Sequence, residues 1–272
     1  VAYSVAVDNT GKAWVVGYTT STLRAGPAIQ FPQYLPIDTT VAGTEEGFIA
    51  RFDTTLTGSA SRLFSSVFGG NGSDILMSVT QDASGNAIIA GYSSSTDWTT
   101  TAGAYDTTQN GSTDGVVLRV STGYALTYSS YLGGSGIDYA ESVAVDASGY
   151  VYLGGFTYST QATFPITAGA ARATLSGTTD SFAAKLDLGV SGSGGLLWST
   201  YGGTGGSTTC ITLDASGNVW LLTDTTYAGA PATPNAADTT YNGGWDGEED
   251  WDNDGFNNLC EVRQGDLEVG DA

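Results

Sequence analysis

Twelve residues near the end of the chain have the types and spacing of a calcium-binding loop. Residues 250–261 have the sequence DWDNDGFNNLCE, which fits the pattern D-x-[DN]-x-[DN]-G-x5-E. Calcium prefers hard oxygen ligands, Gly255 permits the sharp turn, and Glu261 closes the site with its carboxylate. The predicted ligands of Ca2+ are Asp250, Asp252, Asp254, the backbone carbonyl of Phe256, Asn258 and Glu261.

A solvated acidic tail is the alternative interpretation of this segment. Ten of the 28 acidic residues lie between Asp246 and Asp271. Acidity alone accounts for the charge, but not for Gly255 at the sixth position or Glu261 at the twelfth. We therefore expect an acidic calcium-binding tail over residues 248–272, with a short helix from 258 to 264.

The two cysteines form a disulfide candidate. Cys210 lies in a predicted strand and Cys260 in the calcium loop. A bond between them would tie the tail to the rest of the chain in an oxidising compartment. Two separate free thiols, with Cys210 as a small core residue, remain the alternative.

Charge and composition exclude several classes of partner. The 272 residues carry a formal net charge of -20 and contain no His. Nucleic acids and anionic membrane surfaces attract positive protein surfaces, so neither is an expected partner. No apolar run is long enough to cross a bilayer, so membrane insertion is not expected. Without His, the chain lacks the commonest general base.

A β-hairpin recurs four times along the chain. Alternating apolar residues precede and follow a turn that begins at Asp8, Asp82, Asp146 and Asp214. A third strand is predicted at 47–52, 115–120 and 181–186, and a fourth at 64–68, 128–132 and 198–201. Four short strands in a unit of this length predict an all-β fold, a β-propeller of about four blades.

The fourth unit departs from the other three. The predicted units cover about residues 1–63, 64–126, 127–197 and 198–247 of a domain spanning 1–247. In the fourth, Glu248-Glu249-Asp250 stands where the second has Val116-Val117-Leu118. Counting strands gives four, four, three and three, fewer than four complete blades need. An incomplete last blade leaves an unpaired edge, which can accept a strand from another chain.

Two resemblances add to this interpretation. The segment YLGGSGIDYAESVAVDASGYVYLGGFTYST (residues 131–160) resembles the SBBP β-propeller repeat of bacterial secreted and surface proteins, over about residues 1–247. The calcium loop lacks an entering helix and resembles the EF-hand-like loops of dockerins and thrombospondin type 3 repeats. These resemblances imply a propeller fold and an extracellular location, and they supply no catalytic residues.

We therefore expect a non-enzymatic structural protein that is secreted or at the cell surface. Calcium would stabilise it, and strand complementation would join copies into a homo-oligomer or filament. A carbohydrate-binding or adhesion module, with glycans as ligands, is the alternative. A propeller glycoside hydrolase is favoured least, because the four turn aspartates occupy equivalent positions and mark no single site.

Overall fold

The computed structural model describes residues 1–21, 31–40, 42–203 and 205–224. The regular structure of these ranges consists of β-strands and two short 3-10 turns, η2 (Gly58–Ser61) and η3 (Gly192–Gly195). The predicted all-β class is therefore confirmed. No helix within the described ranges combines the length and apolar content that crossing a membrane requires.

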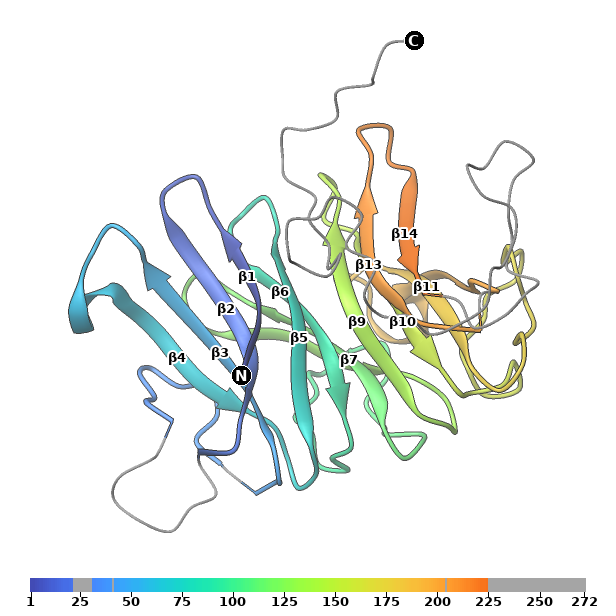
Figure 1. Ribbon diagram of the computed structural model, residues 1–272, viewed down its shortest axis with the longest axis horizontal. Helices are drawn as coiled ribbons and strands as arrows, with labels where there is room; N and C mark the ends of the chain where they lie inside the picture. Colours follow the sequence, from blue (N-terminus) through green and yellow to red (C-terminus); the bar gives the residue numbers. More distant parts are fainter. Residues whose placement is uncertain (22–30, 41, 204, 225–272) are drawn as a thin grey trace, which may run out of the picture.

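The strands pair into four antiparallel sheets that follow the chain order. Figure 1 shows them side by side, from blue through green and yellow to orange. Sheet 1 is β1 (Ala2–Val7), β2 (Lys12–Thr19), β3 (Glu46–Asp53) and β4 (Arg62–Phe68). Sheet 2 is β5 (Asp74–Gln81), β6 (Ala87–Ser93), β7 (Asp114–Val120) and β8 (Leu126–Leu132). Sheet 3 is β9 (Asp138–Val145), β10 (Val151–Thr157), β11 (Asp180–Leu186) and β12 (Leu196–Tyr201). Sheet 4 is β13 (Thr208–Leu213) and β14 (Val219–Thr223).

Each predicted hairpin is present, and its aspartate holds the turn. In sheet 3 the carboxylate oxygen Oδ1 of Asp146 accepts hydrogen bonds from the backbone N–H groups of Ser148 (2.9 Å) and Tyr150 (3.0 Å). Between them Gly149 has a φ of 87°, which favours glycine. Asp8, Asp82 and Asp214 accept the equivalent pairs of bonds. These aspartates therefore act as turn residues.

The fourth strand of each unit pairs with the third strand of the same unit. β4 pairs with β3, β8 with β7 and β12 with β11, so the sheets span 2–68, 74–132 and 138–201. The sheets therefore end one strand later than the boundaries we placed near 63, 126 and 197. Sheet 3 has four strands where three were predicted, and sheet 4 has two within the described residues.

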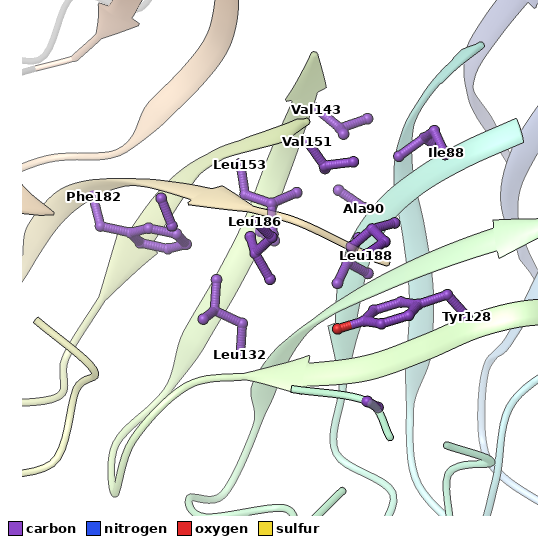
Figure 2. Packing of buried hydrophobic residues seen from close by; sticks show 14 of the residues in the cluster. Ile88, Ala90, Tyr128, Leu132, Val143, Val151, Leu153, Phe182, Leu186 and Leu188 are labelled. Carbon is purple, nitrogen blue, oxygen red and sulfur yellow. The ribbon is translucent and has the colours of Figure 1, made fainter. Parts of the chain in front are cut away.

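Apolar side chains fill the space between successive sheets. The first strand of each sheet packs against the first three strands of the preceding one, as β9 does against β5, β6 and β7. Figure 2 shows the core between sheets 2 and 3, where Ile88 and Ala90 face Val143 and Val151. Each sheet thus needs a neighbour on both faces to bury its apolar side chains.

Candidate functional site

The predicted calcium ligands, Asp250, Asp252, Asp254, Phe256, Asn258 and Glu261, lie outside the described residues, so the calcium loop stays a prediction. Up to residue 224, and apart from the gaps at 22–30, 41 and 204, no three or more His, Cys, Asp or Glu side chains gather to hold a metal ion. The chemistry within the described part must therefore be sought in smaller groups.

Among the described residues, five acidic side chains are completely buried at the junctions between sheets. They begin the third strand of sheets 1, 2 and 3 or the first strand of sheets 2 and 3. A buried carboxylate is costly unless hydrogen bonds or a counter-charge compensate it. The five residues, each 0% exposed, are Glu46, Asp74, Asp114, Asp138 and Asp180.

The two acids that begin first strands are well compensated. Asp74 accepts bonds from the Gly70 backbone N–H (2.7 Å) and from the hydroxyls of Ser93 (2.5 Å) and Ser95 (2.7 Å). Asp138 accepts the equivalent bonds from the Gly134 N–H and two hydroxyls. These donors offset part of the effect of burial, which still raises the pKa of Asp74 and of Asp138.

A third-strand acid faces each of these aspartates across a glycine. A Cβ atom built on Gly69 would lie 2.0 Å from Oε2 of Glu46 and 2.7 Å from Oδ2 of Asp74. The two oxygens are therefore at most about 5 Å apart, within the range in which like charges raise each other's pKa. Around Gly133 the corresponding distances are 2.8 Å to Oδ1 of Asp114 and 2.9 Å to Oδ2 of Asp138.

In both pairs the third-strand acid has one buried oxygen without a hydrogen-bond donor. These atoms are Oε2 of Glu46 and Oδ1 of Asp114, the same oxygens that face the neighbouring aspartate. Burial raises the pKa of Asp114 to about 7, and the charge of Asp138 adds to this effect. Burial also raises the pKa of Glu46, with a smaller contribution from Asp74. A proton on the third-strand acid would supply the donor that each pair lacks.

The junction between sheets 3 and 4 has the third-strand acid, Asp180, but a threonine in place of the first-strand acid. Thr208 stands at the position of Asp74 and Asp138. Here Oδ1 of Asp180 accepts bonds from the backbone N–H groups of Gly203 (2.8 Å) and Gly205 (3.3 Å). Backbone donors thus satisfy this carboxylate where the second acid is missing.

The acid pairs lie between sheets and have no exposed surface through which to reach a substrate. They are 0% exposed and recur at equivalent positions of different sheets. They were not among the residues predicted from the sequence. Two repeated sequence patterns could have revealed them. The third-strand acid stands immediately before a glycine in Glu46-Gly47 and Asp114-Gly115, and the first-strand acid ends the pattern Gly-Gly-x-Gly-x-Asp in sheets 2 and 3.

A serine hydroxyl also links each sheet to the next. The hydroxyl of Ser4 accepts a bond from the Val79 backbone N–H (3.2 Å), and Ser78 accepts one from Val143 (3.3 Å). Ser142 does the same for the N–H of Ile211 (3.0 Å). In sheet 4 the equivalent residue is Cys210.

Cys210 is 7% exposed and is disulfide-bonded rather than a free thiol. Its predicted partner, Cys260, lies outside the described residues. The pairing of Cys210 with Cys260 therefore stays a prediction.

Aromatic rings form a row across sheets 2 and 3. Tyr92 stacks on Tyr139 with ring centroids 3.7 Å apart, and Phe156 follows at 4.7 Å from Tyr139. Tyr158, which is 48% exposed, ends the row. Tyr92, Tyr139 and Phe156 are half-buried, so Tyr158 is the ring of this row that lies open to solvent.

Neither a protein-family model nor a curated protein matches this chain.

Proposed function

We propose that this chain is a non-enzymatic structural module of an extracellular protein, either secreted or at the cell surface, that associates with further copies of itself. Its sheets would be the blades of an SBBP-type β-propeller with the first strands innermost. Calcium bound by residues 250–261 would stabilise the module. The contacts of each first strand with three strands of the preceding sheet support the propeller arrangement.

The open face of sheet 1 is the observation that carries the proposal. Val5 of β1 is 59% exposed, and Val7 is 60% exposed. Val79 and Val143 occupy the position of Val5 in sheets 2 and 3, where each packs on the preceding sheet and is 6% exposed. In sheets 2 and 3 this face packs against the preceding sheet, whereas in sheet 1 it is exposed to solvent.

A sheet of the same kind, supplied by a second copy, would bury this face. β14 also has a second edge that no strand pairs with in the described ranges, whereas β2, β6 and β10 each have a third strand there. Such an edge is a template for strand addition. Association through these ends is head-to-tail, which gives a ring if it closes and a filament if it does not.

The repetition of the buried acids supports a scaffold rather than an enzyme. A catalytic carboxylate pair must reach its substrate and usually occurs once in a fold. The pairs Glu46–Asp74 and Asp114–Asp138 are inaccessible and occur twice.

Light scattering over a concentration series tests the association. We expect calcium-loaded protein to form dimers or larger species, and Val5→Lys to shift it toward the monomer because a charge on this face would have to be buried. Val190→Lys is the matched control, because Val190 is 41% exposed and lies in the loop after β11 of sheet 3, outside sheet 1 and β14. A sharp monomer at high concentration would refute self-association.

Carbohydrate binding is the second candidate, and the aromatic row from Tyr92 to Tyr158 is the observation that favours it. A glycan array tests this function directly. Binding that Tyr158→Ala abolishes, in a protein that stays monomeric, would favour an adhesion module over a self-associating scaffold.

A further inference from the structure

Sheet 4 has an open apolar face at the opposite end of the series. Trp220 is 62% exposed and Leu222 is 48% exposed. Trp220 occupies the position of Trp14, which is 0% exposed and packs in the core shared with sheet 2. In the other sheets, the face that carries these side chains packs against the following sheet. In sheet 4 the same face is exposed.

Cys210 lies on this same outer face. In the register of sheet 4, Cys210 pairs with Leu222, and Trp220 pairs with Thr212. Because side chains alternate along a strand, Cys210, Thr212, Trp220 and Leu222 share one side, opposite Ile211. Ile211 packs inward against sheet 3.

The residue type at position 210 breaks the pattern of the junctions. Ser4, Ser78 and Ser142 each accept a backbone N–H of the following sheet. Cys210 replaces that hydroxyl acceptor and is disulfide-bonded instead. Since the only other cysteine of the sequence is Cys260, the covalent partner within the chain belongs to the acidic tail.

We infer that the tail caps the end of the sheet series: residues 250–261, tethered by a Cys210–Cys260 disulfide, cover Trp220 and Leu222. The inference rests on the proposed function for the calcium that orders the loop and for the extracellular location that permits the disulfide. The bond forms when the two thiols give two protons and two electrons to an oxidised thiol carrier of the secretory route.

The tail fits this face better than a second copy does. A disulfide at position 210 occupies the point where the next sheet would place its backbone N–H. The tail begins at residue 248, after the segment 224–247 that follows β14, and carries nine acidic residues, so it can set a polar outer surface over apolar side chains. Terminal caps with a polar outer face are how repeat architectures end. The cap would leave the second edge of β14 open for strand addition by another copy.

Hydroxyl-radical footprinting of the full chain, read by mass spectrometry, tests the cap. We expect Trp220 and Leu222 to be labelled several-fold less in the native protein than in Cys210→Ser. Serine occupies this position in the three other sheets, so the variant should keep its fold. Cys260→Ser provides a second release of the tether. Tyr158, which is 48% exposed, should be labelled equally in all samples.

Peptide mapping without reductant should yield one species that contains both cysteines. Two free thiols, a bond between two chains, or equal labelling of Trp220 in the native protein and both variants would overturn the cap. Calorimetry with calcium keeps the two proposals separate. Protection of Trp220 without calcium binding would refute the calcium role alone, whereas calcium binding without protection would refute the cap alone.

Discussion

Asp114 and Asp138 face each other across Gly133, with their nearest oxygens 2.8 Å and 2.9 Å from the position that a Cβ of residue 133 would occupy. The oxygen on Asp114 has no donor, whereas the oxygen on Asp138 accepts bonds from the Gly134 N–H and the Ser159 hydroxyl. Burial raises the pKa of both acids, but the donors to Asp138 offset part of this effect, so Asp114 is the acid of the pair better placed to hold a proton. This asymmetry makes the junction between sheets 2 and 3 sensitive to pH.

Asp114→Asn should weaken the pH dependence of stability. Burial raises the pKa of Asp114 to about 7, whereas Asp in an unfolded chain titrates near about 3.9. The folded state therefore binds the proton more tightly. The resulting stability is fully present below about pH 4 and is lost as the pH rises to about 7. The amide keeps a donor at every pH, so the variant should be more stable than the parent by about 1–3 kcal/mol at about pH 8.

Asp180→Asn is the matched control for this prediction. It should lower the free energy of unfolding, whereas Asp114→Asn should raise it. Asp180 accepts backbone N–H groups on both oxygens, from Ser176 and Gly203 among others. An amide would turn its NH2 group toward a donor and lose at least one of these bonds. Urea unfolding at several pH values measures both variants. Equal slopes with pH for Asp114→Asn and the parent would contradict the assignment of the proton to Asp114.

Gly69→Ala should destabilise the junction between sheets 1 and 2. The new Cβ would lie 2.0 Å from Oε2 of Glu46 and 2.7 Å from Oδ2 of Asp74, which is closer than any carbon–oxygen contact allows. Overpacking of this kind costs about 1–3 kcal/mol, and more where charged groups must move. Gly123→Ala is the control, because the nearest atom to its Cβ would be 3.8 Å away. Thermal unfolding should separate the two variants clearly.

The sequence predicts the strands well because each hairpin carries local information. Alternating apolar residues and the bonds from Asp146 to the next turn residues are properties of a short segment. The same local information does not say which sheet a strand joins. The order of strands in a repeat is cyclic, so a strand between two units can belong to either sheet. β4 follows β3 and precedes β5 in sequence, and only its pairing with β3, as of Phe64 with Arg51, assigns it to sheet 1.

The burial of the acid pairs could not be predicted from local sequence patterns of this kind. Asp114 precedes Gly115, and an acid beside a glycine indicates an exposed turn when judged alone. Its burial depends on the turn before β9 and on Asp138, which is 24 positions along the chain. A carboxylate becomes buried only when distant segments supply its donors, so no local pattern could assign Asp114 to the core.

Ser142→Ala should loosen sheet 4 from sheet 3. The Ser142 hydroxyl accepts the Ile211 N–H at 3.0 Å, and Ile211 is buried between the two sheets. An N–H left without an acceptor in such a place costs about 1–3 kcal/mol. We expect faster hydrogen exchange at Ile211 and unchanged exchange at Val143. Ser148→Ala, at an exposed turn where only the backbone of Ser148 makes the bond, should leave both amides unchanged.

Removing calcium should affect the tail far more than the sheets. The described residues contain no gathering of three or more acidic, Cys or His side chains for a metal, whereas residues 250–261 supply six predicted ligands. A chelator should therefore speed proteolysis beyond residue 224 and change the main thermal transition little. Glu261→Gln removes the closing carboxylate and should weaken calcium binding by about tenfold or more, which is about 1.4 kcal/mol.

Glu268→Gln is the control for that experiment, because it removes the same charge from the same tail outside the loop pattern. A specific site depends on which oxygen is lost, whereas a diffuse acidic tail depends only on the total charge. Calorimetric titration of the two variants separates these cases. If both weaken calcium binding equally, the ion is held by the general charge of the tail, and the ligand set that ends at Glu261 is wrong.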